Sequence, residues 1–241
     1  MFDIFIKNKK IVVDCFTNNS AIHEFFPIAS ADEFYPQWWK NMSATMKTST
    51  EFGIQRDSPT IKRCDGILDL YKHGICMPLW SDLIIETTTT DYKYQYSSNE
   101  NLPIVTHNRT AMGPAFNNYT HLKIHSPWIF EEKTGMDFLF TQPSWNMLDY
   151  IRDIIVLPGM VNYRDQGGTH VNMLLPRKVN RIELSAGLPI AHMIPLSDKT
   201  IDVRTHLVSD QEWTHRNLRY TYLSSFIGRY KKNVRKIKKT S

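Results

Sequence analysis

The stretch that decides the fold reads Asp82-Leu-Ile-Ile-Glu-Thr-Thr-Thr-Thr and then, after Asp91, Tyr92-Lys-Tyr-Gln-Tyr. Its pattern has a period of two, and β-branched and aromatic residues dominate it. Both properties favour strands over helices, because successive side chains of a strand point to opposite faces of a sheet. The segment therefore predicts a β-hairpin.

More strand candidates follow this hairpin at short, near-regular spacing. Turn signals such as Thr134-Gly135, Gly167-Gly168 and Ala186-Gly187 separate them. The candidates are residues 119–125, 136–141, 154–161, 170–175, 181–184, 190–194 and 201–208. Many short strands divided by turns indicate a mainly β chain, folded as an antiparallel barrel, a sandwich or a β-clip-like arrangement.

The first third of the chain carries helical signals. Residues 10–16 read as a strand. Residues 31–42 contain Pro36-Gln-Trp-Trp-Lys, which predicts a short helix with proline at its start. Residues 66–72 predict a second short helix, which ends at Gly74 because glycine suits the left-handed conformation that follows many helices. We therefore expect short N-terminal helices inserted into the β-rich part.

The charge of the chain is concentrated at one end. The sequence has 241 residues, is 41% hydrophobic and carries a formal charge of +5. Nine Lys or Arg and no Asp or Glu follow from Arg216 onward. Subtracting these nine from the 29 basic residues leaves 20 against 24 acidic ones, a net of −4 for the rest. The apolar fraction suits a folded core, and the charge indicates a mildly acidic body with a basic tail.

Residues 209–241 read as a basic amphipathic helix that follows a single β-rich domain over residues 1–208. Ser209 and Glu212 form a capping box. Basic side chains interleaved with a tyrosine can contact phosphates and stack on a base, so the helix is a candidate for nucleic-acid or protein contact. A helix that packs one stripe on the body, and one that lies on a membrane surface, are the alternatives. The contact candidates are Arg229, Tyr230, Lys231, Lys232, Arg235, Lys236, Lys238 and Lys239.

The usual catalytic and cofactor motifs do not occur in the sequence. It has no GxSxG, GxGxxG, P-loop or HExxH pattern, and its histidines follow no metal-ligand spacing. Three cysteines far apart indicate reduced thiols in a cytoplasmic setting and no zinc site. No apolar stretch is long enough to span a membrane. We therefore expect no metal, no cofactor and no catalytic residues, which favours a non-catalytic role.

Ligand-binding candidates gather in the second half of the chain. A polar turn between two hydrophobic strands brings Asn162, Tyr163, Arg164 and Asp165 together, and such a cluster could hold a phosphate or a sugar. An ordered hairpin loop whose Asn and Asp bond their own backbone is the alternative. The remaining candidates, on neighbouring strands, are His125, Trp128 and His192.

Two pieces of this region resemble the nucleotide pocket of trimeric dUTPases and dCTP deaminases. They are Gly159-Met-Val-Asn162 and Gly187-Leu-Pro-Ile-Ala-His192, and the similarity covers about 40 residues. It implies a β-clip fold and a nucleotide pocket in this region. The corresponding alternative function is a binding protein or enzyme for a nucleotide or a 2-oxo acid, with its pocket near Asn162, Arg164 and His192. The family's base-activating aspartate is replaced by Asn162, which cannot accept a proton at neutral pH. The resemblance therefore does not imply pyrophosphohydrolase activity.

A second resemblance covers nearly the whole chain. Segments including Trp38-Trp-Lys, Met77-Pro-Leu-Trp-Ser-Asp82, Ser126-Pro-Trp128 and Ile194-Pro-Leu are similar to an uncharacterised protein family of large tailed bacteriophages of marine bacteria. The resemblance implies a viral protein. With no catalytic motif, we expect it to act through protein partners or self-association in a virion or host-takeover assembly. A small-molecule binding protein or enzyme, and nucleic-acid contact through the tail, are the alternatives.

Overall fold

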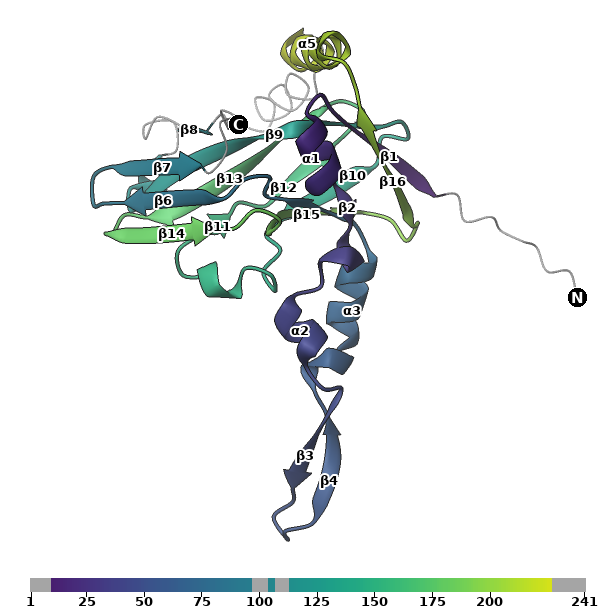
Figure 1. Cartoon of the computed structure of the whole chain (residues 1–241), viewed down its shortest axis with the longest axis vertical. Helices are drawn as coiled ribbons and strands as arrows, with labels where there is room; N and C mark the ends of the chain where they lie inside the picture. The colour runs from purple at the N-terminus through teal and green to yellow at the C-terminus, as the bar shows by residue number, and fades with distance from the viewer. Residues whose placement is uncertain (1–9, 97–103, 107–112, 227–241) are drawn as a thin grey trace, which may run out of the picture.

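The body of the protein is built from β-sheets, and a narrow arm extends from it (Figure 1). The computed structural model describes residues 10–96, 104–106 and 113–226. The largest sheet has six strands in the order β11-β13-β9-β1-β16, and β8 pairs with β9. Its strands are β1 (Ile11–Thr17), β8 (Ile104–Thr106), β9 (Tyr119–Glu132), β11 (Ile155–Val156), β13 (Gly168–Pro176) and β16 (Ile201–Leu207).

Two further sheets complete the body. The second sheet has the order β12-β10-β15-β5-β2, and the third has the order β14-β6-β7. Strands of the second sheet are β2 (Ala29–Ser30), β5 (Ile75–Pro78), β10 (Asp137–Thr141), β12 (Gly159–Asn162) and β15 (Pro189–Pro195). Those of the third are β6 (Leu83–Thr87), β7 (Tyr92–Tyr96) and β14 (Asn180–Leu184). The predicted hairpin is confirmed as β6 and β7, with Leu83 opposite Tyr96.

Side chains from all three sheets meet in one hydrophobic core. Phe130 of β9, Phe138 of β10 and Leu83 of β6 are each fully buried in it. The prediction of a mainly β chain is confirmed. Of the three arrangements expected from the sequence, the barrel is not found, because the described strands form several sheets and no closed barrel. Among the described strands the pairing is antiparallel except between β1 and β16, which run parallel.

Two of the predicted strands have different limits in the structure. β9 continues past residue 125 through Pro127 to Glu132, so Ser126-Pro-Trp128 also belongs to this strand. The segment 154–161 is two short strands, β11 and β12, separated at Leu157-Pro158. Proline supplies no backbone N–H, so it interrupts a strand where that donor would be needed and is tolerated where the pairing is irregular.

Short helices connect the first strands. They are α1 (Ser20–Phe25), α2 (Gln37–Asn41) and α3 (Asp65–Lys72), with 3-10 turns η1 (Ala31–Phe34), η2 (Ile61–Arg63), η3 (Pro114–Phe116) and η4 (Leu148–Tyr150). Gly74 follows α3 with a φ of 93°, as predicted for a helix end. A Cβ on Gly74 would stand 2.5 Å from the carbonyl oxygen of Met193, so this position requires glycine.

A second, smaller core joins α2 and α3 to the sheets. It contains Trp39, Ile67 and Tyr71 around Cys76 of β5. Tyr35 stacks on the ring of Trp39 with 4.3 Å between ring centroids. Cys76 faces this cluster, whereas its neighbours Ile75 and Met77 face the main core. The alternation of side chains along β5 therefore connects the helical part to the body.

Between α2 and α3 the chain extends outward as the arm, residues 43–60. Strands β3 (Thr45–Ser49) and β4 (Gln55–Pro59) pair with each other and with no other described strand. No residue from 43 to 60 is buried. The arm projects away from the body (Figure 1). No described segment covers either face of this two-stranded ribbon.

The last described helix, α5 (Asp210–Phe226), docks on the six-stranded sheet. The backbone N–H of Glu212 donates to Ser209 Oγ at 3.2 Å, as the capping box predicts. The guanidinium of Arg216 lies 3.7 Å from the ring centroid of Phe16 and donates to Glu131 Oε1 at 2.7 Å. The rest of the predicted tail helix, residues 227–241, lies outside the described residues.

A buried carboxylate closes the turn between β9 and β10. Glu132 is 2% exposed, and its two carboxylate oxygens accept hydrogen bonds from the backbone N–H groups of Thr134, Gly135 and Met136 at 2.7, 2.7 and 2.9 Å. Gly135 has a φ of 79°, which a side chain would strain. Three amides that would otherwise be unpaired are thereby satisfied by one charged group.

We predict that Glu132→Gln destabilises the protein by about 2 kcal/mol, because an amide replaces charge-assisted acceptors and places an N–H₂ group against backbone donors. Urea unfolding monitored by circular dichroism measures this change. Glu51→Gln on the exposed arm is the control, with an expected change within about 0.5 kcal/mol. Equal stabilities of the two variants would contradict this role for Glu132.

Candidate functional site

A pocket of about 610 Å³ lies between α5 and the six-stranded sheet. Aromatic residues from distant parts of the chain form much of its wall: Trp80 follows β5, Trp128 lies on β9 and Trp213 lies on α5. His125 of β9 and His170 of β13 complete this part of the wall. The pocket therefore contains two of the ligand-binding candidates that the sequence predicted, His125 and Trp128.

The two histidines meet because their strands pair. His170 lies directly opposite His125 in the antiparallel register of β13 and β9. Their ring centroids are 4.2 Å apart, and the rings are inclined by 54°. His170 was not among the residues predicted for the site, because its partner is fixed by a register that the sequence pattern does not specify.

Both imidazoles are held in their neutral form. Desolvation by burial, followed by the positive charge of Lys123 and by His125, lowers the pKa of His170 to about 4. Burial and Lys123 also lower the pKa of His125. A neutral imidazole has one donor and one acceptor nitrogen. At neutral pH this pair can therefore bind polar groups but contributes no positive charge to the pocket.

Four ring nitrogens of the wall are buried without a hydrogen-bond partner among the described residues. They are Trp128 Nε1, Trp213 Nε1, His125 Nε2 and His170 Nδ1. A buried polar group that lacks a partner destabilises a protein by about 1–3 kcal/mol. All four nitrogens are buried inside the wall, so in this conformation they are not exposed to the open space of the pocket.

The local structure of β9 explains how Trp128 reaches the pocket. Its backbone N–H donates to Ser126 Oγ at 3.0 Å, two residues earlier. The register with β13 shifts between Gly168 and His170, so three residues of β9 lie opposite one residue of β13. Such a bulge changes the direction of the side chains next to it. Trp128 is 1% exposed, so most of its ring is packed.

The predicted polar cluster at Asn162 is a self-contained turn. Asn162 Nδ2 donates to Asp137 Oδ1 at 2.8 Å and to the carbonyl oxygen of Gly135 at 2.7 Å. The backbone N–H of Arg164 donates to Asn162 Oδ1, and that of Asp165 donates to the Asn162 carbonyl oxygen. Arg164 and Asp165 form an exposed ion pair at 3.5 Å. These bonds correspond to the hairpin-loop alternative considered for the sequence.

Tyr163 and His192 are core residues in the structure. Tyr163 is fully buried, stacks on Phe130, and receives a hydrogen bond from Thr169 Oγ1 at 3.2 Å. Burial raises the pKa of its hydroxyl above the usual value. His192 is 2% exposed, and its Nε2–H donates to the carbonyl oxygen of His73 at 2.9 Å.

The structure does not bring His192 beside Asn162. His192 pairs with Thr141 of β10, and Asn162 pairs with Asp137 at the other end of the same strand. The nucleotide or 2-oxo-acid pocket expected near Asn162, Arg164 and His192 is therefore not assembled from these three side chains. All eight contact candidates of the tail, from Arg229 to Lys239, lie outside the described residues, and nucleic-acid contact stays a prediction.

Comparison with known proteins adds no assignment to the site. No family model matches the chain, and no curated protein matches it. Within residues 10–96, 104–106 and 113–226, no three His, Cys, Asp or Glu side chains gather in a way that could hold a metal ion. In the same part of the chain, no helix is both long enough and apolar enough to cross a membrane.

The low pKa of His170 predicts a loss of stability in acid. Its pKa is about 4 when folded and about 6.5 when unfolded, so the unfolded chain binds the proton first. Above pH 6.5 the neutral His170 has no effect on the free energy of unfolding. That free energy declines by about 2–3 kcal/mol as the pH falls toward 4. Urea unfolding at pH 7.5 and pH 5 measures it.

His170→Gln should reduce this pH dependence, because the variant lacks the titrating group. His215→Gln, at an exposed position of α5, is the matched control. If both variants had the same pH dependence as the natural sequence, His170 would not be the buried neutral group that the structure shows.

Proposed function

We propose that this protein is a non-catalytic assembly protein that binds a protein partner through its arm. One observation carries the proposal. The hairpin of β3 and β4 contacts no sheet of the body and has no buried residue, yet it presents large apolar side chains. Phe52 is 88% exposed, Ile54 is 64% exposed and Met46 is 53% exposed.

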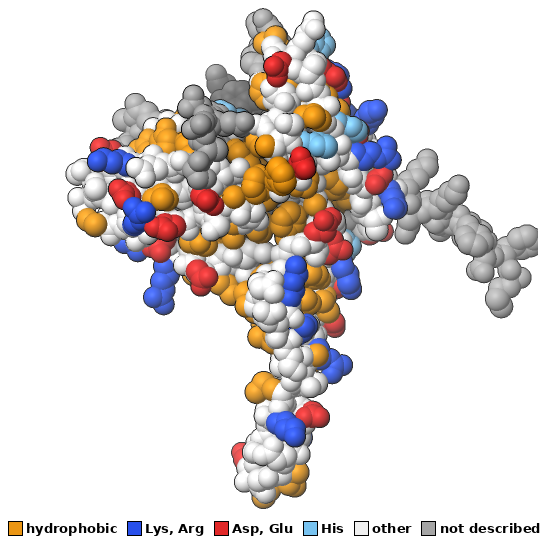
Figure 2. Space-filling view, viewed as in Figure 1, with side chains coloured by type: hydrophobic (Ala, Val, Ile, Leu, Met, Phe, Trp, Pro, Cys, Tyr) orange, Lys and Arg blue, Asp and Glu red, His pale blue; other side chains and the backbone are white. Residues whose placement is uncertain are grey.

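The position of these side chains supports contact with a partner. Figure 2 shows hydrophobic side chains at the end of the arm, away from the body. A two-stranded hairpin without a hydrophobic face to pack on is marginally stable by itself. Burying one Phe or Ile side chain stabilises an interface by about 1.5–3 kcal/mol. A partner that covers the arm would supply the core that the hairpin lacks.

The charge of the arm favours a protein over a nucleic acid. Between residues 43 and 60 it carries Lys47 and Arg56 against Glu51 and Asp57, so its formal charge is zero. Binding to a phosphate backbone requires a surplus of positive charge. Serine and threonine dominate the rest of the segment. A neutral, polar ribbon with an apolar end suits a groove on a protein.

The wider setting follows from the resemblance to the family of tailed-phage proteins. We infer that the partner belongs to a virion or host-takeover assembly, either another subunit or a second copy of this chain. We also infer a sandwich-like layering of the two larger sheets, supported by the core that they share.

We predict that the intact protein self-associates or binds to phage particles and that Phe52→Ser with Ile54→Ser weakens this association about a hundredfold. Two apolar side chains that contribute about 1.5 kcal/mol each account for that factor. Sedimentation velocity measures self-association, and co-sedimentation measures binding to particles.

Val179→Ser is the matched control, because Val179 is 82% exposed but lies outside the arm. It should leave the association unchanged. Neither substitution touches the core, so the far-ultraviolet circular dichroism of both variants should match the original protein. A strict monomer that does not bind particles, or equal losses in both variants, would overturn the proposal.

A further inference from the structure

The hydrogen bonds of the arm show which of its backbone groups point outward. Thr50 N–H donates to the carbonyl oxygen of Ile54 at 2.9 Å, and Thr60 N–H donates to that of Ala44 at 3.1 Å. Hydrogen-bonded and non-hydrogen-bonded pairs alternate along an antiparallel ladder, so even-numbered residues bond within the hairpin. The outward positions are 45, 47 and 49 on β3 and 55, 57 and 59 on β4.

The outer edge of β3 is open to another strand. Thr45 N–H donates to Ser43 Oγ at 3.4 Å. Outside the hairpin, no described residue accepts a hydrogen bond from the N–H of Lys47 or Ser49. On the β4 edge, Pro59 has no N–H to donate. Free backbone groups at a sheet edge bind an extended strand by continuing the ladder, and β3 presents the more complete edge.

The sequence of β3 is compatible with pairing to itself. Two identical antiparallel strands related by a twofold axis pair around one central residue, which lies opposite its own copy. With Thr48 at the centre, threonine lies opposite threonine, a favourable cross-strand pair. Lys47 then lies opposite Ser49 of the other copy, and the two Lys47 side chains share one face with the two Glu51 side chains. The charges of that face balance, and no like charges lie directly opposite each other.

The corresponding pairing of two β4 strands is unfavourable. A centre at Arg56 or Asp57 places two like charges directly opposite each other. A centre at Ser58 places Pro59 opposite Asp57, which removes two ladder bonds from the dimer because proline has no N–H. A centre at Gln55 lies at the end of the strand, so almost no ladder forms. Between the two edges of the arm, β3 is therefore the one that suits a second copy.

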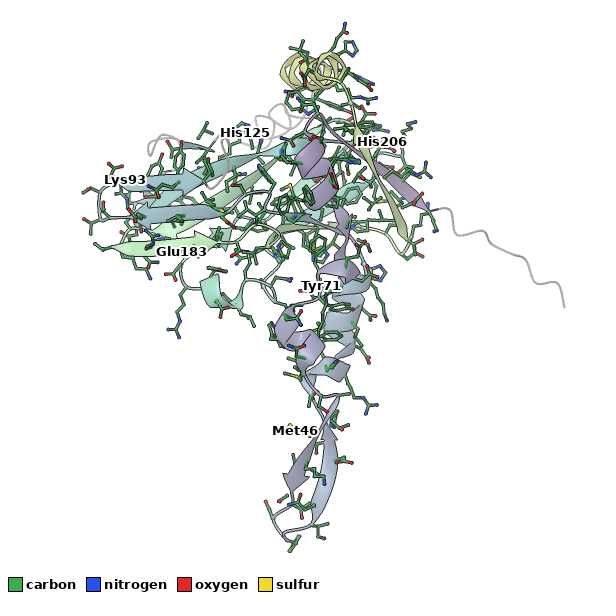
Figure 3. The ribbon with its side chains drawn as sticks, viewed as in Figure 1. Met46, Tyr71, Lys93, His125, Glu183 and His206 are labelled. Carbon is green, nitrogen blue, oxygen red and sulfur yellow. The ribbon has the colours of Figure 1, made fainter. Side chains whose placement is uncertain are left out.

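The position of the arm leaves room for this pairing. Figure 3 shows Met46 on the arm, away from the β-rich body that contains His125. With Thr48 at the centre, Phe52 of one copy lies level with Ala44 of the other, so the two bodies stand at opposite ends of the paired arms.

We propose, on the basis of the partner binding proposed above for the arm, that the partner is a second copy of this chain. The two arms pair edge to edge along β3, antiparallel, with Thr48 at the twofold axis. The product is a four-stranded ribbon. Such an isologous contact closes at two copies, because the same edge is used on both sides.

Cross-linking tests the register. Thr48 occupies a non-hydrogen-bonded pair across the axis, where the Cα atoms are about 4.5 Å apart, within the range that a disulfide bridges. We expect Thr48→Cys to form a covalent dimer under mild oxidation, measured by non-reducing electrophoresis. The background is Cys64→Ser, because Cys64 is exposed whereas Cys15 and Cys76 are buried. Ser58→Cys in the same background, on β4, is the matched control and should stay monomeric.

Proline substitutions test the edge. Lys47→Pro removes two ladder bonds from the dimer and should weaken self-association about thirtyfold, measured by sedimentation velocity. Asp57→Pro removes an outward N–H of β4 and should leave it unchanged. Neither position bonds within the hairpin, so the far-ultraviolet circular dichroism of both variants should match that of the original protein.

Three results would overturn this pairing: equal cross-linking of the two cysteine variants, equal self-association of the two proline variants, or a chain that binds phage particles but stays monomeric. The third result leaves the proposed function of the arm intact and replaces the second copy with another subunit. A chain that neither self-associates nor binds particles overturns both proposals.

Discussion

The irregular pairing of β9 determines the geometry of the six-stranded sheet. Residues 119–125 of this strand pair with β13, and residues 129–132 pair with β1. Pro127 lies between the two halves and has no N–H to donate. The structure tolerates it because three residues of β9 face one residue of β13 at this point, so no regular ladder bond is required. The same bulge places Trp128 in the wall of the pocket, and the end of the strand positions Glu132 at its turn.

The local sequence pattern predicted those strands that have one buried and one exposed face. The β6–β7 hairpin has a buried face and an open face, so its period of two is visible. The end of α3 at Gly74 and the capping box of α5 depend on single residues with specific backbone roles. The arm could not be predicted in this way. Both faces of β3 and β4 are exposed, so nothing imposes an alternation of apolar and polar side chains.

Long-range pairing explains the differences at the candidate site. Asn162 and Asp165 are typical turn residues, and their hydrogen bonds are satisfied within the turn and by the neighbouring strand. His125 and His170 are 45 positions apart, and Trp80 and Trp213 are more distant still. Their meeting depends on the register of β9 and β13 and on the docking of α5. Neither is encoded in a short segment, so the sequence identified two residues of the pocket and not the pocket itself.

The arm and the pocket depend on different parts of the core. The arm is supported by Trp39, Ile67 and Tyr71, which reach the body through Cys76 of β5. The pocket depends on β9 and on the contacts of α5, where the ring of Tyr220 fits against Gly167 so closely that a Cβ there would lie 2.2 Å from it. A partner at the arm would therefore act first on the cluster around Trp39, and a ligand in the pocket would act first on α5. No residue belongs to both clusters. A substitution at the arm should therefore leave the pocket unchanged, and a substitution in the pocket should leave partner binding at the arm unchanged.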